Sequence, residues 1–112
     1  IKGWANRKLA SYTEAEQALR QCLALGAANV DIYNELAICT MELEQFSESA
    51  RFLRKALEME PENVKIISNF GVLEMKRGNP DEALRFFQVA NALDPDDPVS
   101  QEYIKVLTAH NG

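Results

Sequence analysis

Residues 69–95 read NFGVLEMKRGNPDEALRFFQVANALDP, a pattern that predicts two helices separated by a sharp break at Gly78-Asn79-Pro80. Glycine permits the left-handed conformation that ends a helix, and proline is well tolerated at a first helical position. Residues 35–61, ELAICTMELEQFSESARFLRKALEMEP, carry the same kinds of residue in the same order, 34 positions earlier. The chain therefore repeats one helical hairpin, and no segment alternates for long enough to predict a strand.

The repeated positions divide into small and large side chains. Equivalent residues 34 positions apart are Tyr33/Ile67, Leu36/Phe70, Ala37/Gly71, Leu53/Phe87, Ala56/Ala90 and Pro61/Pro95. Small residues let two helices approach closely, large residues fill the space beside them, and the prolines end each second helix. One hairpin cannot bury its apolar face alone, whereas stacked hairpins bury their faces against their neighbours.

These motifs resemble the tetratricopeptide repeat (TPR) family, whose 34-residue pattern is W-x2-L-G-x2-Y, then A-x3-F, then P. The matching positions are Ile67, Phe70, Gly71, Glu74, Ala83, Phe87 and Pro95 in one unit, and Tyr33, Leu36, Ala37, Thr40, Ser49, Leu53 and Pro61 in the other. The resemblance implies an all-α fold of antiparallel helical hairpins, stacked as a right-handed α-solenoid. We expect a single domain over 1–112, made of a partial repeat (1–29), two repeats (30–63 and 64–97) and a capping helix (98–112). Because the chain starts at Ile1, we also expect it to be a fragment of a longer protein.

Capping residues predict where the helices begin and end. Thr13-Glu14-Ala15-Glu16 fits a capping box, so we expect a break before Thr13 and a helix from there to about Leu25, stopped by Gly26. The expected caps of the five later helices are Asn29, Ser47, Asn63, Asn79 and Asp97, for helices over about 30–43, 48–58, 64–77, 80–93 and 98–109.

Composition excludes several classes of function. A net charge of −5 argues against a nucleic-acid surface and against docking on anionic lipid. No apolar run reaches the roughly 18 residues of a membrane span, so no membrane insertion is expected. Cys22 and Cys39 lack a metal or disulfide pattern and are expected to be reduced core residues, which suits a cytoplasmic location.

The sequence predicts no catalytic residue, no metal site and no cofactor. The single histidine, His110, lies near the C-terminus without a partner motif. Glu74 stands where the family prefers tyrosine, and we expect it to be an acid paired with Arg77 rather than a catalytic carboxylate. Asp94, Asp96 and Asp97 are expected to be turn and cap residues, because the spacing of a calcium loop is missing.

The resemblance implies a concave groove, lined by the first helix of each repeat, that holds a peptide or helix of a protein partner. Helical spacing places Asp31, Asn34, Ile38 and Met41 on one face, with Lys65, Ser68, Val72 and Met75 as their equivalents and Val99, Glu102 and Val106 in the closing helix. The expected groove residues are Trp4, Arg7, Lys8, Asn34, Ile38, Met41, Lys65, Ser68, Val72, Met75 and Lys76. This set favours a peptide with apolar side chains and some acidic character. Two alternatives stay open: ordinary interface packing of the methionines, and coverage of Trp4 by an upstream helix of the parent.

Some TPR proteins clamp the C-terminal carboxylate of heat-shock chaperones. Lys65 matches one clamp position, but Glu35 stands where asparagine is expected and Asn69 where arginine is expected, so this partner is not favoured. The leading hypothesis is a non-catalytic protein–protein interaction module. The alternatives are a structural element, with self-association through the N-terminal edge, and a substrate-positioning arm of a larger enzyme such as a glycosyltransferase.

Overall fold

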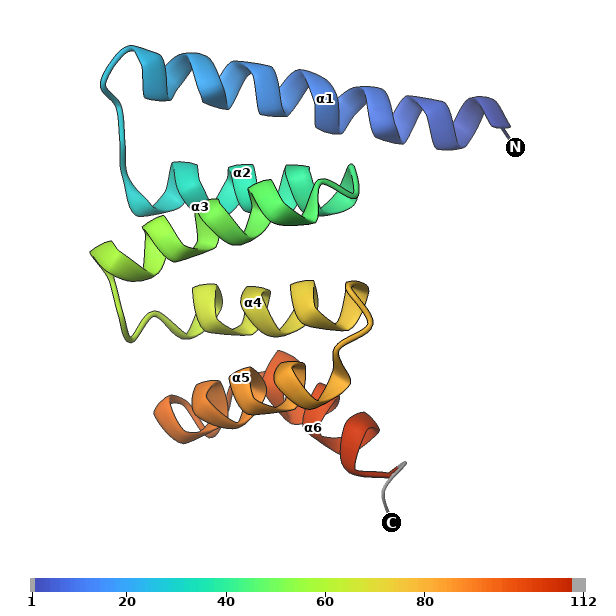
Figure 1. Cartoon of the computed structure of the whole chain (residues 1–112), viewed down its shortest axis with the longest axis vertical. Coiled ribbons are helices and arrows are strands. Elements are labelled where there is room, and N and C mark those ends of the chain that lie inside the picture. The colour runs from blue at the N-terminus through green and yellow to red at the C-terminus, as the bar shows by residue number, and fades with distance from the viewer. Residues whose placement is uncertain (1, 110–112) are drawn as a thin grey trace. The chain divides into compact units, whose positions relative to one another are not determined.

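Helices account for most of the computed structural model, which describes the backbone of residues 2–109 and the side chains of residues 9–109. The helices are α1 (Lys2–Ala24), α2 (Val30–Glu42), α3 (Phe46–Met59), α4 (Val64–Lys76), α5 (Pro80–Leu93) and α6 (Pro98–Ala109) (Figure 1). The described residues contain no strand, which confirms the predicted all-α class. In the same part of the chain, no helix is long and apolar enough to cross a membrane.

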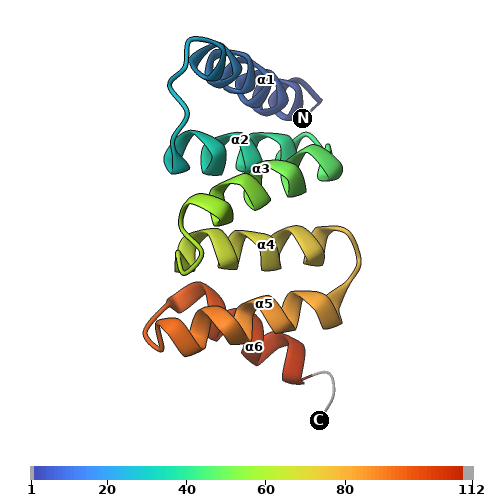
Figure 2. The same ribbon diagram turned by 60° about the vertical axis from the view of Figure 1, so that its left-hand side comes forward.

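The first of two compact units covers residues 1–59 and holds α1, α2 and α3. In it α2 packs against both α1 and α3, and successive helices run in opposite directions (Figure 2). Leu36, Ala37, Leu53 and Ala56 are fully buried. These are predicted packing positions of the repeat, so the small and large residues do form the core of this hairpin.

The second unit covers residues 60–112, and in it α5 packs against both α4 and α6. Its centre is a cluster of Ala83, Phe87 and Leu107. A Cβ atom built on Gly71 would lie 2.6 Å from Cζ of Phe87, so α4 approaches α5 as closely as it does only because Gly71 has no side chain. The ring of Tyr103 is stacked on the Phe87 ring with centroids 4.5 Å apart.

Three helices end in the same way, with one residue in the left-handed conformation. Gly26 follows α1 with φ of 88°, Glu44 follows α2 with φ of 61°, and Gly78 follows α4 with φ of 81°. After α2, the Gln45 N–H donates to the Thr40 carbonyl at 2.8 Å, as in a Schellman motif. The stops at Gly26 and Gly78 were predicted from sequence, whereas Glu44 carried no such signal.

The predicted break before Thr13 is wrong, because α1 is one continuous helix from Lys2 to Ala24. The Thr13 hydroxyl donates to the Leu9 carbonyl oxygen at 2.9 Å, one turn back in the same helix, instead of capping a new one. Residues 9–13 contain neither glycine nor proline, so nothing in the backbone opposes continuation of the helix.

The other predicted caps have mixed outcomes. Asn29 and Asn63 accept from the backbone N–H groups of Ile32 (2.9 Å) and Ile66 (3.3 Å), which confirms both as caps. Ser47 is not a cap, because α3 already begins at Phe46. Asn79 precedes Pro80 as expected, but it makes no side-chain cap.

Candidate functional site

A hollow of about 360 Å³ lies in the second unit, where the first turns of α4 meet the connection from α5 into α6. We call it the α4–α6 pocket. Its walls are Asn63, Val64, Lys65, Ser68, Asn69, Asp94, Asp97 and Val99. Local sequence builds both sides, because Asn63 starts α4 as its cap and Asp97-Pro98 starts α6.

Asp97 holds the two sides of the pocket together. Its Oδ2 accepts a hydrogen bond from the backbone N–H of Ser100 at 3.1 Å, which caps α6. The same oxygen accepts from the Ser68 hydroxyl on α4, also at 3.1 Å. The cap role was predicted from sequence, whereas the bond to α4 was not.

The hydrogen bonds at Asp97 keep its carboxylate charged. Partial burial acts to raise the pKa of Asp97, but hydrogen bonds from Ser100, Ser68 and the backbone of Val99 outweigh that effect and lower the pKa. Asp94 adds a second carboxylate, and its Oδ1 accepts from the Asp96 N–H at 3.1 Å. The pocket wall therefore contains two carboxylates and one ammonium group, that of Lys65.

Two residues of the predicted groove, Lys65 and Ser68, line this pocket. Lys65 is exposed, whereas Ser68 is buried and acts by binding Asp97. Lys76 is exposed at the end of α4. The pocket thus gathers one of the predicted basic residues together with two acids that the prediction assigned only to turns and caps.

Four residues of the predicted groove are buried or half-buried. Met41 is buried, which agrees with the alternative of interface packing, and Asn34 is buried as well. Val72 and Met75 are half-buried and pack against the cluster of Ala83, Phe87 and Leu107. These four residues therefore do not form an open floor.

The remaining predicted site residues give less information. Ile38 is half-buried on α2. The side chains of Trp4, Arg7 and Lys8 lie outside the described residues, and His110 does as well. Their part in a groove stays a prediction.

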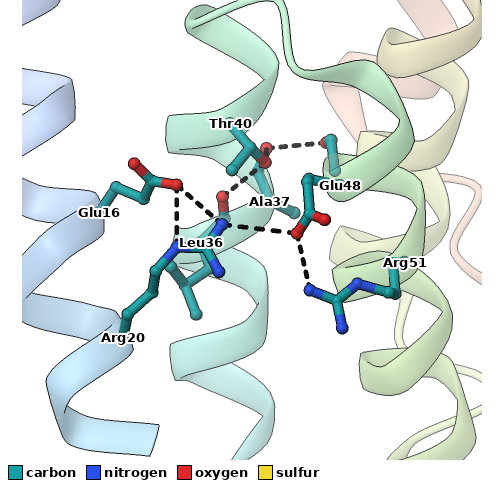
Figure 3. Close-up of polar contacts among 8 residues, drawn as sticks. Glu16, Arg20, Leu36, Ala37, Thr40, Glu48 and Arg51 are labelled. Carbon is teal, nitrogen blue, oxygen red and sulfur yellow. Dashed lines mark hydrogen bonds and ion pairs between the residues drawn. The ribbon is translucent and has the colours of Figure 1, made fainter.

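Polar residues also form a network in the first unit (Figure 3). Nη2 of Arg20 on α1 lies 2.8 Å from Oε2 of Glu16 and 3.4 Å from Oε2 of Glu48 on α3. Arg51 binds the same Glu48 oxygen at 2.7 Å. Both guanidinium groups lie over the Phe52 ring, at 5.2 and 5.1 Å from its centroid. These groups satisfy each other and tie α1 to α3, so we assign the network a structural role.

Glu74 is paired with Arg77 as predicted, at 3.7 Å between Oε2 and Nη1. Its other oxygen accepts from the Asn79 side chain at 2.9 Å. That bond explains why Asn79 does not cap α5, because its amide is turned back toward α4. Glu74 therefore links the end of α4 to the turn that leads into α5.

The comparison with protein families identifies the chain. A tetratricopeptide repeat model matches residues 41–102, more than half of the sequence, so the chain belongs to the TPR family. No curated protein matches it. The fold is also similar to that of the Arabidopsis OM64 TPR domain, with a TM-score of 0.82 and 26% identity over 97% of this chain and 90% of that one. The predicted TPR-like fold is therefore confirmed.

Two further structures are similar to this chain. The second TPR domain of human RPAP3, solved in complex with the HSP70 peptide SGPTIEEVD, has a TM-score of 0.78 and 17% identity over 96% of this chain and 91% of that one. YrrB, described as a TPR protein with an unusual peptide-binding site, has a TM-score of 0.75 and 25% identity over 91% of this chain. The match covers 53% of YrrB, so this chain spans about half of its length.

Proposed function

We propose that this chain is a non-catalytic interaction module that binds a peptide of a protein partner. The observation that carries this proposal is the α4–α6 pocket. It is a hollow beside the first turns of α4, and charged groups form part of its wall. The TPR domain of human RPAP3 holds a peptide, and its similar fold supports the same class of function here.

The repeat division is part of the same proposal. In it α2 and α3 form the repeat over 30–63, α4 and α5 form the repeat over 64–97, and α6 is the capping helix. The first helices of these repeats are α2 and α4, and the α4–α6 pocket lies between one of them and the cap. The partial repeat over 1–29 is represented by α1.

Binding of the acidic tail of a heat-shock chaperone is not favoured. Lys65 lines the pocket, but Asp94 and Asp97 line it as well, and carboxylates repel an acidic peptide at this short range. Glu35 and Asn69 also depart from the clamp pattern. The partner is therefore a different kind of peptide.

Panning of a displayed library of random decapeptides tests the proposal. The test variant is the double substitution Val99→Glu/Val106→Glu, because these α6 side chains are 41% and 43% exposed. Val89→Glu is the control for an added surface carboxylate, since Val89 on α5 is 50% exposed; it adds one negative charge, and the double variant adds two. Val72 and Met75 are unsuitable, because charges there would enter the core.

We expect the native chain and Val89→Glu to enrich the same peptides and the double variant to lose them, while circular dichroism shows that all three proteins are folded. Two results contradict the proposal. One is that the native chain enriches no peptide. The other is that the double variant enriches the same peptides as the native chain.

A further inference from the structure

We propose that the α4–α6 pocket takes an arginine side chain of the partner peptide, and that Val106 contacts an apolar side chain three residues away from that arginine. This inference rests on the proposed peptide-binding function and adds the chemistry of the ligand. It follows from the charge of the pocket, its size, and the exposed apolar face of α6.

The charge of the pocket favours a cation. Hydrogen bonds from Ser68 and Ser100 fix the Asp97 carboxylate at the pocket wall. Binding of a ligand therefore does not require the entropic cost of ordering this side chain. Among the described residues, the Asp94 carboxylate accepts one hydrogen bond, from the Asp96 N–H, and a carboxylate offers about four acceptor sites. Asp94 therefore retains capacity for a donor from a ligand, and the ammonium of Lys65 balances only one of the two negative charges.

Arginine fits this wall better than lysine. Its planar guanidinium carries five N–H donors and binds carboxylates in a bidentate manner, whereas an ammonium group is compact and strongly hydrated. The volume of about 360 Å³ lies near the lower end of the range for ligand pockets, about 300–1,000 Å³. It suits one long side chain, whose methylene groups would pack against Val99.

The apolar face of α6 sets the spacing. Val99 lines the pocket, and Val106 lies seven residues later on the same helical face, with 43% of its side chain exposed. Seven residues of α-helix advance about 10.5 Å, and an extended peptide advances about 3.3 Å per residue. Three peptide residues therefore span the two valines, so the expected motif is an arginine and an apolar residue separated by two others.

The test uses the random decapeptides enriched by the native chain, resynthesised with a fluorophore. Affinities are measured by fluorescence anisotropy for the native chain, Asp94→Asn and Asp96→Asn. Asparagine at position 94 keeps an oxygen that can accept the Asp96 N–H, so the turn is preserved. Asp96→Asn removes the same charge from the same turn, but Asp96 does not line the pocket.

We expect arginine to be enriched among the selected peptides, with an apolar residue three positions away. Asp94→Asn should weaken binding about ten- to a hundredfold, the loss typical of a hydrogen bond to a charged group, while Asp96→Asn changes it less than twofold. Replacement of the peptide arginine by glutamine should have an effect similar to that of Asp94→Asn. Lys65→Gln should tighten binding, because it removes a positive charge from the pocket wall.

The outcomes separate this inference from the proposed function. Selected peptides that lack arginine but still depend on Val99 and Val106 would overturn the arginine site and leave the peptide-binding function standing. Equal losses in Asp94→Asn and Asp96→Asn would also overturn the site, because they would indicate a general effect of charge. Enrichment of no peptide would refute both proposals.

Discussion

Glu44 occupies a backbone position that glycine normally fills. It ends α2 with φ of 61°, whereas Gly26 and Gly78 occupy the equivalent places after α1 and α4. The left-handed conformation brings Cβ close to the backbone, at a cost of roughly 1 kcal/mol for a residue other than glycine. The hydrogen bonds of the cap are formed nevertheless. The Gln45 N–H donates to the Thr40 carbonyl oxygen, and the Glu44 N–H donates to the Met41 carbonyl oxygen.

Replacement of Glu44 by glycine should therefore stabilise the protein. We expect the free energy of unfolding to rise by about 0.5–1 kcal/mol, measured by urea denaturation. The matched control is Gly78→Ala, which should lower it by a similar amount, because it places a Cβ at φ of 81°. A lower stability of the Glu44→Gly variant would show that the side chain, not the backbone, determines this position.

At the scale of elements, the two repeats solve the same packing problem with different side chains. The pair Ala37 and Leu53 in one repeat corresponds to Gly71 and Phe87 in the other. All of them are buried, so the volume lost on the first helix is matched by volume gained on the second.

Gly71→Ala should be destabilising even though alanine is the better helix former. The new Cβ would meet the Phe87 ring at 2.6 Å, and Tyr103 is stacked on that ring. Overpacking costs typically 1–3 kcal/mol, and the gain of about 1 kcal/mol in helix propensity offsets only part of it. Urea denaturation should show a net loss of stability for the single variant.

The double variant Gly71→Ala/Phe87→Leu recreates the pair of the other repeat and provides the control. We expect it to lose less stability than the sum of the two single variants, which is a favourable coupling in a double-mutant cycle. If the two stability losses simply add, the choice of residue at position 71 does not depend on the residue at position 87.

Local signals predicted most of the helix ends, and the errors arise where a capping pattern is present but does not act as a cap. Asn29, Asn63 and the stops at Gly26 and Gly78 depend on neighbours within one turn, so the sequence contains the necessary information. Thr13 has the same local pattern but lies inside a helix that nothing interrupts, so the pattern alone was not sufficient.

The candidate site was harder to predict than the helices. Helical spacing placed Lys65 and Ser68 on one face of α4, and both line the α4–α6 pocket. The role of Asp97 depends on Ser68, which is 29 residues away in sequence, and no local pattern records that hydrogen bond. The burial of Met41 and the packing of Val72 against the core likewise depend on contacts with other helices, and helical periodicity in the sequence does not record those contacts.

For the whole molecule, one carboxylate in each unit links stability to pH. The hydrogen bond from Arg51 lowers the pKa of Glu48 more than burial raises it, with a further contribution from Arg20. The pKa of Asp97 is lowered by its hydrogen bonds, against the effect of burial. A folded-state pKa below the unfolded value adds stability above the unfolded value, and that stability is lost as the pH falls through the folded-state pKa.

The stability difference between the native chain and Asp97→Asn should therefore depend on pH. The difference should be largest at neutral pH. It should shrink as the pH falls below 3.8, the ordinary pKa of aspartate, because the native carboxylate then becomes protonated and loses its charge. Urea denaturation between pH 7 and pH 3 measures this difference. A constant difference over that range would show that the charge of Asp97 contributes no stability.

The negative charge of the molecule also predicts that an acidic peptide binds to it only weakly. The peptide SGPTIEEVD should bind to the TPR domain of human RPAP3 but not measurably to this chain, because the net charge is −5 and Asp94 and Asp97 line the pocket. Isothermal titration calorimetry of both proteins with the same peptide tests this expectation. Comparable affinities would contradict the assignment of the pocket as an acidic one.

The close contact between Gly71 and Phe87 determines how this chain can be recombined with its relatives. A crossover between hairpins keeps each first helix with the second helix that it fits. A crossover within a hairpin can place an alanine-bearing helix opposite phenylalanine, or a glycine-bearing helix opposite leucine, and so create a clash or a void. Chimeric TPR proteins built from this chain should therefore be joined in the turns that follow α3 or α5, where whole hairpins are exchanged.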